Sequence, residues 1–283
     1  MIITIFTNKT GYYLSNVLKY ILTKEKHIVN IAEKIDLKNE NLYIILFSQK
    51  VKTFPKNYII YNLEQKDISP WINKKYELSM IHSKKSWDYS HVNISKFNAI
   101  VQKKLSYFRL PCIDYNLILE LNNFHPSNNI TKFNLLNNLD IQEFDILFYG
   151  VMNPKRRKIL NQIENKLDKK FKMKIISNIY EYTLFQFIKK SKIILNISYY
   201  ENALLECYRI NEVQSCKKLV ISFYPNNQDI VNCEYYKNSV VFVKTIHEMI
   251  DSIFFYLNNQ DEYNKKINNI KFIENTEFIN DFL

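Results

Sequence analysis

The stretch that most constrains the fold spans residues 192–222, where two short apolar runs flank a helical pattern. Residues 193–197 and 219–222 are predicted to be buried strands, and residues 203–214 between them a helix. A strand–helix–strand unit of this kind is typical of a parallel sheet, and such sheets bind ligands at the carboxyl ends of their strands. The stretch therefore predicts an α/β fold whose binding loop lies at residues 198–202.

The expected helix carries a line of charge. Glu206, Arg209 and Glu212 recur at every third position of a segment that is otherwise mostly apolar. One interpretation is a solvent-exposed face whose charges pair with one another, each pair contributing a few tenths of a kcal/mol. The other is a line that faces a cleft, in which carboxylates hold sugar hydroxyls and the guanidinium holds phosphate. The segment alone leaves both open.

The first half of the chain repeats the alternation of strand and helix patterns that is typical of a parallel α/β sheet. Gly11, one of only two glycines in 283 residues, lies at the turn between the first strand and the first helix. A turn residue is a sufficient explanation for it, and the position is also one where a ligand can approach the backbone. Strands are expected at residues 2–6, 27–31, 42–47 and 58–62, and a helix at residues 12–23.

Two residues after the next expected strand are candidates for acid–base chemistry. Asp88 lies in the segment 86–90, which reads as a strand end followed by a loop. A carboxylate over a cleft can accept the proton of a reacting hydroxyl, although a turn or helix cap explains Asp88 equally well. His91 is a rival candidate for the same role.

A second α/β unit is predicted after an Asn-rich segment, residues 116–138, which reads as an interdomain linker. Its first strand, residues 145–149, ends at Gly150 and leads into a basic helix start, a pattern that suits an anion. The candidates there are Asn153, Lys155, Arg156 and Arg157. Neither G-x-x-x-x-G-K-[ST] nor G-x-G-x-x-G occurs, which argues against a P-loop nucleotidase and a nicotinamide dehydrogenase.

The net charge of +11 raises the question of an anionic partner. The lysines are scattered and interleaved with acidic residues, and the abundance of Lys, Asn, Ile and Tyr is typical of an A/T-biased genome. No concentrated basic stripe or nucleic-acid motif occurs, which argues against nucleic acid as the main partner.

The remaining composition indicates a compartment and excludes a metal site of recognisable spacing. The four cysteines form no C-x-x-C pair and have no histidine at zinc-like spacing, so buried thiols in a reducing compartment are expected. The first residues read as a strand rather than a signal peptide, and no apolar window approaches the ~20 residues that span a bilayer. A cytoplasmic protein is expected.

In the order in which they occur, the segments ILFYG, NPKRRKIL and KKSKIILNISYYENALLECYRINEVQSCKKLVIS resemble the donor-binding domain of group 1 glycosyltransferases with the GT-B fold. The first half looks similar to the acceptor domain of some of these proteins, through YIIYNLEQ, SWDYS and the RLP turn. The resemblance implies two Rossmann-like domains that face a cleft. The first covers residues 1–138 and the second, which binds the nucleotide sugar, residues 139–283, with the C-terminal tail able to pack on the first domain.

The resemblance also implies roles for individual residues. A diphosphate clamp would comprise Asn153, Lys155, Arg156, Arg157 and Arg209, and Glu212 matches the last glutamate of the Glu-x7-Glu signature, which holds ribose. Leu204 takes the place of the first glutamate of that signature, so Glu201 or Glu206 would substitute for it. Tyr199, Tyr200 and Asn202 would lie beside the sugar, with Gly11 on the acceptor side.

The implied activity is transfer of a sugar from a UDP- or GDP-sugar to a glycan or another hydroxyl acceptor, in glycan biosynthesis. The absence of Asp-x-Asp and the presence of basic side chains predict that no metal or other cofactor is needed. Two alternatives stay open. The chain could be a catalytically inactive relative that binds glycans or serves as a scaffold, which the incomplete glutamate pair favours, or a nucleic-acid-binding protein, which only charge and aromatic content favour.

Overall fold

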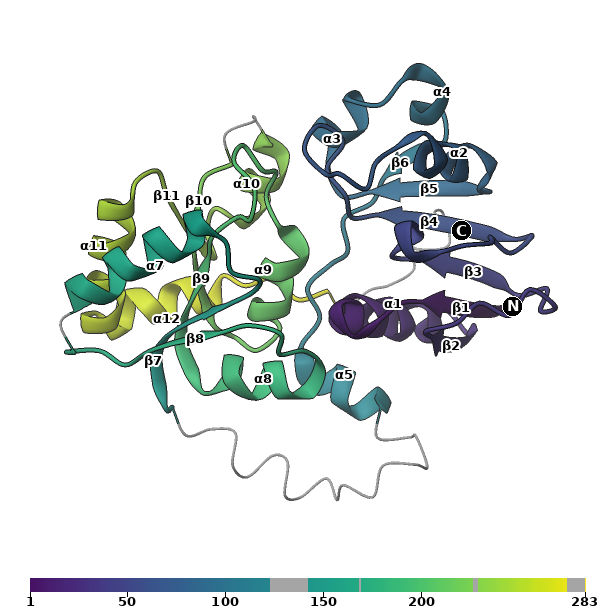
Figure 1. Ribbon diagram of the computed structural model, residues 1–283. Helices are drawn as coiled ribbons and strands as arrows, with labels where there is room; N and C mark the ends of the chain where they lie inside the picture. The colour runs from purple at the N-terminus through teal and green to yellow at the C-terminus, as the bar shows by residue number, and fades with distance from the viewer. Residues whose placement is uncertain (123–141, 168, 226–228, 274–282) are drawn as a thin grey trace. The chain divides into compact units, whose positions relative to one another are not determined.

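The computed structural model describes residues 1–122, 142–167, 169–225, 229–273 and 283. The chain divides into two compact units, each with its own parallel sheet (Figure 1). Unit 1 contains Met1–Pro111, and unit 2 contains Cys112–Asn226 and Ile230–Phe272. The expected α/β class with two Rossmann-like domains is confirmed. The expected boundary at residue 138 and the expected packing of the tail at residues 274–282 lie outside the described residues.

Unit 1 is built on six parallel strands in the order β2-β1-β3-β4-β5-β6. The strands are β1 (Ile2–Phe6), β2 (Ile28–Ala32), β3 (Leu42–Ile45), β4 (Tyr58–Asn62), β5 (Lys85–Asp88) and β6 (Leu105–Tyr107). Their connections include the helices η1 (Lys9–Gly11), α1 (Tyr12–Lys24), η2 (Ser48–Lys50), α2 (Lys74–His82), α3 (His91–Ser95) and α4 (Ala99–Gln102).

The core of unit 1 is formed by buried apolar side chains of its central strands and of the helices that cover them. β4 is buried along its whole length, as expected for a strand that is covered by helices on both faces. On one face, Ile45 and Ile60 pack with Met80 of α2 and Val101 of α4. β2 is largely exposed and forms one edge of the sheet.

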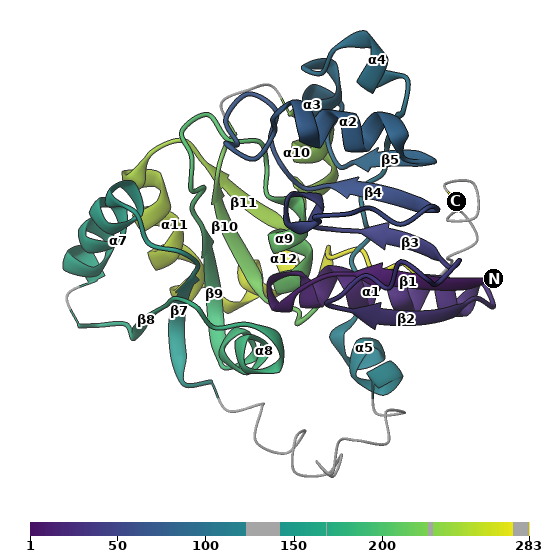
Figure 2. The same cartoon turned by 45° about the vertical axis from the view of Figure 1, so that its right-hand side comes forward.

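Unit 2 is built on five parallel strands in the order β11-β10-β9-β7-β8 (Figure 2). The strands are β7 (Phe144–Tyr149), β8 (Met173–Ile176), β9 (Ser191–Asn196), β10 (Leu219–Phe223) and β11 (Val240–Val243). Its helices within the described residues are α5 (Tyr115–Asn122), α7 (Pro154–Leu167), α8 (Glu181–Lys189), α9 (Cys207–Gln214), α10 (Ile230–Tyr236), α11 (Ile246–Asn258) and α12 (Gln260–Asn268).

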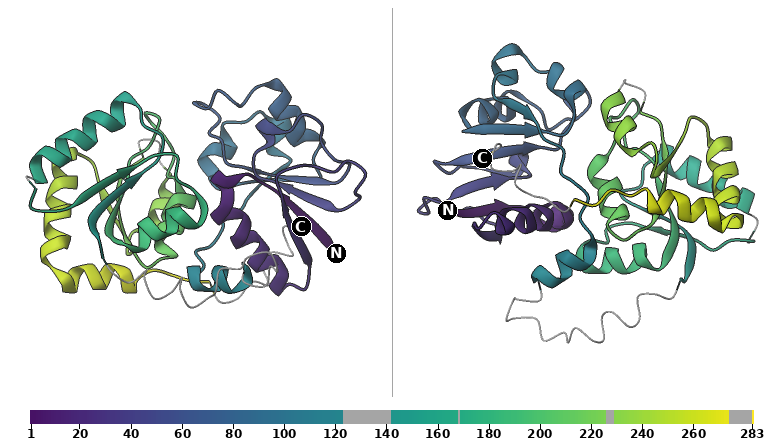
Figure 3. Two further views of the ribbon diagram at one scale, coloured as in Figure 1. Left: turned by 60° about the horizontal axis from the view of Figure 1, so that its bottom comes forward. Right: turned by 180° about the vertical axis from the view of Figure 1, so that it is seen from behind.

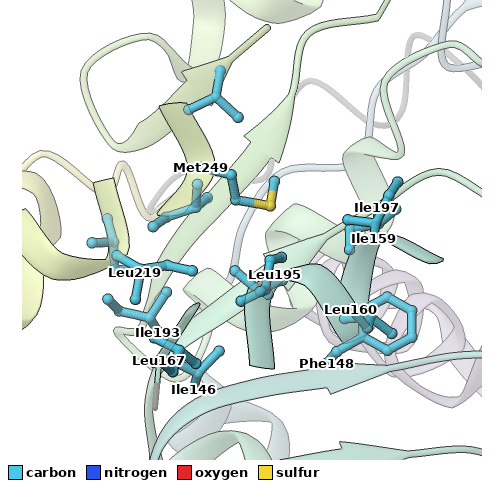
Figure 4. Close-up of a cluster of buried hydrophobic side chains, with 14 of the residues drawn as sticks. Ile146, Phe148, Ile159, Leu160, Leu167, Ile193, Leu195, Ile197, Leu219 and Met249 are labelled. Atoms are coloured by element: carbon cyan, nitrogen blue, oxygen red, sulfur yellow. The ribbon is translucent and has the colours of Figure 1, made fainter. Parts of the chain in front are cut away.

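The larger core of unit 2 lies between its sheet and helices α7, α11 and α12 (Figures 3 and 4). Ile146, Ile193 and Leu219 are partners in adjacent strands and point to this face. Leu160 of α7 and Met249 of α11 are fully buried against them. Successive residues of a strand face opposite sides of the sheet, so the intervening apolar residues are buried on the other face, where α8 and α9 contact β9.

The strand order places a ligand-binding position in unit 2 between β7 and β9. These strands are neighbours, but α7 after β7 packs in the core cluster on one face of the sheet, and α9 after β9 lies outside that cluster. The loops that leave the two strands therefore diverge. Open α/β sheets bind ligands in the crevice at such a switch point.

Two expectations about local structure are wrong. Residues 116–122, expected to be the start of a linker, belong to the helix α5. The ring of Tyr115 stacks on the ring of Phe185 in α8, with centroids 3.8 Å apart, and Ile118 is fully buried. The helix expected from residue 203 begins at Cys207. Residues 203–205 are consecutive apolar residues that are all buried, which one face of a helix cannot achieve and an irregular loop can.

Candidate functional site

The carboxyl ends of β7 and β9 bring together several buried charged residues of unit 2. The loop after β7 contains Gly150 and leads to Arg156 in the first turn of α7. The loop after β9 leads to Glu206, the N-cap of α9, and to Arg209 in its first turn. We call Arg156 and Arg209 the arginine pair. The charged line on α9 therefore faces the switch point rather than solvent, because Glu206 and Arg209 are each only 9% exposed.

Gly150 makes the approach of the two arginines possible. Its φ of +138° lies in a region that residues other than glycine rarely adopt. A Cβ atom built on it would lie 3.1 Å from Arg156 Nη1 and 3.1 Å from Arg209 Nη2. The two guanidinium groups thus flank the same backbone position, where a glycine leaves room for both.

Gly150→Ala is expected to lower the free energy of unfolding of unit 2 by about 1–3 kcal/mol, the usual cost of a residue held in a sparsely populated backbone region. The new methyl group would also push the arginine pair apart. Hydrogen exchange of β7 and α9 measures the effect on unit 2 alone. Val151→Ala is the matched control, because Val151 is the next residue and is 52% exposed. Equal exchange in the two variants would contradict the prediction.

Arg156 is 2% exposed and its side chain is fixed by several contacts. Nε donates to Ile197 O at 2.9 Å and Nη1 donates to Val151 O at 2.7 Å. Its Cζ lies 5.4 Å from the ring centroids of both Phe148 and Tyr199. Burial, together with the nearby positive charge of Arg209, lowers the pKa of Arg156 to about 10. Arg156 therefore carries its charge at neutral pH at an unusual desolvation cost.

Arg209 lies over the ring of Tyr149, with its Cζ 5.0 Å from the ring centroid. Its Nη1 is 3.3 Å from Glu206 Oε2, and Arg156 Nη2 is 3.9 Å from Glu206 Oε1. Burial opposes the charge of Arg209, but Glu206 and, more weakly, Tyr149, Tyr208 and Glu212 together outweigh it, so its pKa is raised. One carboxylate thus serves two buried guanidinium groups.

Hydrogen-bonding capacity is left over in this cluster. Within the described residues, Arg156 Nη2, Arg209 Nη1 and Glu206 Oε2 are buried and have no hydrogen-bond partner, although both nitrogens lie within ion-pair distance of Glu206. A buried donor without a partner costs free energy, more so when it is charged. Two convergent donors of this kind, in the first turns of α7 and α9, suit an anionic ligand with several acceptor oxygens.

Glu212 lies one turn further along α9. Tyr149 donates its hydroxyl hydrogen to Glu212 Oε2 at 2.7 Å. Burial raises the pKa of Glu212 to about 7, although the Tyr149 hydrogen bond and the charge of Arg209 oppose the rise. Glu212 is therefore a carboxyl group poised between its two protonation states near neutral pH.

The start of α7 holds the loop at residues 197–201 in place. Asn153 caps the helix by accepting from Arg156 N at 2.8 Å, and its Nδ2 donates to Tyr199 O at 2.7 Å. Lys155 Nζ donates to Ser198 Oγ at 3.2 Å and Tyr200 O at 3.0 Å, and it pairs with Glu201 at 3.2 Å. Pro154 suits the first helical position, where its missing N–H costs nothing.

A pocket of about 310 Å³ adjoins the arginine pair. It lies at the carboxyl ends of β9 and β10, and Thr245 and Ile246 at the start of α11 also line it. Lys155, Glu201, Asn202 and Glu206 line it as well. Glu206 connects the two features, because it both lines the pocket and pairs with the arginines.

The predicted residues of unit 2 are thus only partly brought together. Arg156, Arg209, Glu206 and Glu212 converge at the switch point. Arg157, one position after Arg156, is on the exposed face of α7. Four further predicted residues form the loop after β9. The rings of Tyr199 and Tyr200 contact edge-on, and Glu201 and Asn202 line the pocket; Asn202 is exposed and has a φ of +52°.

In unit 1, Gly11 is buried at the carboxyl end of β1, where a Cβ atom would lie 2.5 Å from Thr7 Oγ1 and 2.6 Å from Phe47 Cε2. A side chain is excluded there by packing, which agrees with the interpretation as a turn residue. His91 begins α3, is exposed, and stacks on Tyr107 with ring centroids 3.9 Å apart.

Asp88 is fully buried at the end of β5. Its Oδ2 accepts from Asn62 Nδ2 at 2.6 Å and Asn93 Nδ2 at 2.7 Å, and its Oδ1 accepts from Ser90 N at 2.9 Å. Burial raises the pKa of Asp88 to about 7 against these hydrogen bonds. Asp88 therefore organises the loop that carries His91, and His91 is the more accessible of the two.

Four residues of the site were not predicted from the sequence. Tyr149 orients Glu212, and Asn196, Ser222 and Lys244 line the pocket. Asn196 Nδ2 donates to Ser222 Oγ at 3.0 Å across adjacent strands. A polar residue near the carboxyl end of an apolar run was the available signal for Asn196 and Ser222, since such positions lie at the binding edge of a parallel sheet.

Within the described part of the chain, no group of three or more His, Cys, Asp or Glu side chains is arranged to hold a metal ion. The described helices include none that is long and apolar enough to cross a membrane.

No protein-family model matches the chain, and no curated protein matches its sequence. Solved structures do match, over nearly the whole chain. A glycosyltransferase from Rickettsia africae ESF-5 has a TM-score of 0.53 at 13% identity, covering 94% of this chain and 91% of its own. Anabaena Alr3699/HepE in complex with UDP and glucose has a TM-score of 0.52 at 9% identity, with coverage of 99% and 97%. An alpha-glucosyltransferase in complex with UDP has a TM-score of 0.55 at 10% identity, with coverage of 99% and 98%.

Proposed function

Because this chain has the GT-B glycosyltransferase fold, we propose that it transfers a sugar from a nucleoside diphosphate donor to a hydroxyl acceptor without a metal ion. The donor would be a UDP- or GDP-sugar. Two of the structures that share the fold contain UDP, and an alpha1,3-fucosyltransferase that also shares it contains GDP. At these sequence identities the likeness supports the fold, and the residues at the switch point must support the reaction.

The observation that carries the proposal is the arginine pair across Gly150, with one buried nitrogen on each guanidinium that lacks a hydrogen-bond partner within the described residues. In sugar transfer the bond between the sugar and the diphosphate breaks, and negative charge develops on the departing diphosphate. Fixed cations in a site that excludes water stabilise that charge strongly. Arg156 and Arg209 are both fixed and buried, so they can take the place that a divalent cation has in other enzymes.

The other residues of the site take roles that follow from their chemistry. Glu212, held by Tyr149, can accept hydrogen bonds from the ribose hydroxyls. Glu206 and the loop Tyr199–Tyr200–Glu201–Asn202 line or cover the pocket into which the sugar would extend. Asn153 and Lys155 hold that loop, and Lys155 adds positive charge near the diphosphate.

For the acceptor hydroxyl, His91 is the better candidate for a general base. Its ring is accessible and already oriented by Tyr107, whereas Asp88 has no exposed surface. Asp88 would act as a positioning residue, because it holds Ser90 N and Asn93 on either side of His91. A general base must reach the proton that it removes, which favours the exposed ring.

Isothermal titration with UDP and GDP, in EDTA and in magnesium, tests the donor site. We expect one of the two to bind equally in both buffers. Arg156→Lys should weaken that binding at least tenfold, because an ammonium cannot reproduce the planar set of N–H donors. Arg157→Gln on the same helix is the matched control and should bind as the native protein does.

Three other outcomes would contradict the proposal. Binding of neither nucleotide would remove the donor site and favour the scaffold alternative. Binding that needs magnesium would contradict metal independence. Affinity for DNA or RNA with a steep salt dependence, equally reduced by Arg156→Lys and Arg157→Gln, would indicate a nucleic-acid-binding protein instead.

A further inference from the structure

An ion pair lies at the edge of the pocket in unit 2. Lys155 Nζ is 3.2 Å from Glu201 Oε2, and both residues line the pocket. Glu201 belongs to the loop after β9, and Lys155 to the first turn of α7. The pair therefore joins the loop after β9 to the start of α7, the two segments that diverge at the switch point.

The two partners are held very differently. The Lys155 side chain is 24% exposed and has two further acceptors, Ser198 Oγ and Tyr200 O. The Glu201 side chain is 73% exposed, and Lys155 is its partner in the pair. Lys155 can therefore keep its position when Glu201 leaves, because two of its three contacts remain. Glu201 can rotate into water with little loss of burial.

The position of Lys155 makes it a further cation for the donor. It lines the same pocket as Glu206, which in turn pairs with Arg209. A diphosphate bound to the arginine pair and extending toward the pocket would pass the ammonium group of Lys155. An anionic oxygen there would meet the carboxylate of Glu201, and two like charges cannot share one ammonium group without a cost.

We propose that Glu201 competes with the diphosphate of the donor for Lys155, so that the Lys155–Glu201 pair is a latch that the donor must open. This inference rests on the proposed function. The latch and the alternative role of Glu201, as a ligand of sugar or ribose, predict opposite effects on donor binding. A competitor weakens donor binding, whereas a ligand residue strengthens it.

Titration of Glu201→Gln with the nucleoside diphosphate alone separates these roles. As a latch, Glu201 weakens donor binding by about the free energy that an exposed ion pair contributes. Its removal should therefore lower the dissociation constant of the nucleoside diphosphate about two- to fivefold. As a ribose ligand, its removal should weaken the nucleoside diphosphate. As a ligand of the transferred sugar, its removal should leave the nucleoside diphosphate unchanged and weaken only the nucleotide sugar. Either of the last two results overturns the latch.

Two controls test whether a gain arises from Lys155. Glu143→Gln removes the same charge from the ion pair between Glu143 and Lys190. These residues directly precede β7 and β9, so the pair lies at the amino ends of the strands, away from the pocket. An equal gain in that variant would mean general electrostatic attraction and would overturn the proposal. In a Lys155→Gln background, Glu201→Gln should give no further gain, and a gain that persists there overturns it as well.

The experiment also distinguishes failure of the latch from failure of the proposed function. If the native protein binds a nucleoside diphosphate and Glu201→Gln does not tighten it, only the latch fails. If the native protein and Glu201→Gln both bind neither UDP nor GDP, the donor site itself is wrong, and the latch falls with it.

Discussion

Arg209→Met is expected to abolish nucleoside diphosphate binding and to lower the free energy of unfolding of unit 2 by about 3–5 kcal/mol. Methionine fills a similar space but carries no charge, so Glu206 loses its closest cation and Glu212 loses the charge that lowers its pKa. Glu206 then keeps only the more distant Arg156, at 3.9 Å, and a buried charge that loses its closest partner is costly. Titration calorimetry measures the binding, and hydrogen exchange of α9 and β10 measures the stability of unit 2.

A second variant separates folding from binding. Arg209→Met combined with Glu206→Gln removes that carboxylate but also takes it from the buried Arg156, so stability should return only in part while the nucleoside diphosphate still fails to bind. Recovery of binding in the double variant would contradict the role assigned to Arg209. Native-like stability in the single variant would contradict the buried ion pair.

Asp88→Asn is expected to lower the free energy of unfolding of unit 1 by about 3 kcal/mol, because a buried donor would then face another donor. The Asp88 carboxylate accepts from two amide groups on one oxygen and from a backbone N–H on the other. In either orientation, the new amide group puts its nitrogen against one of these donors. Both tryptophans of the chain, Trp71 and Trp87, lie in unit 1, so fluorescence during urea unfolding reports on this unit.

The same variant should change the pH dependence. Burial raises the pKa of Asp88 to about 7, against about 3.9 in an unfolded chain, so folded unit 1 binds more protons than unfolded unit 1 between these values. The contribution of Asp88 to stability is therefore complete below about pH 4 and is lost as the pH rises through about 7. The native protein should lose stability over this range more steeply than Asp88→Asn. Equal slopes would contradict the prediction.

Asp67→Asn is the control for both measurements. Asp67 is an acidic residue of the same unit whose side chain is 59% exposed and pairs with Lys96 at 3.3 Å. Its substitution should alter stability by less than about 1 kcal/mol, as is usual for exposed ion pairs.

Hydrophobic periodicity was sufficient to predict the two parallel sheets. Runs such as residues 193–197 and 219–222 became buried strands, because a strand covered on both faces is apolar throughout. Periodicity failed at residues 203–205, where an apolar run was assigned to a helix and forms a buried loop. A short apolar run has no period of its own, so only the surrounding tertiary structure distinguishes these conformations.

The candidate site was predictable at the level of loops rather than side chains. The basic start of α7 and the charged line of α9 were placed correctly at strand ends. Whether Arg156 or Arg157 is buried depends on the rotation of α7 against the sheet, and adjacent helical residues point about 100° apart. Likewise, the environment of Asp88 depends on Asn62, which is 26 residues away in the sequence.

The two glycines of this chain both lie in the connection that follows the first strand of a unit, Gly11 after β1 and Gly150 after β7. At both places a methyl group would meet atoms within about 3 Å. Any side chain at either turn would therefore have to displace a neighbouring residue.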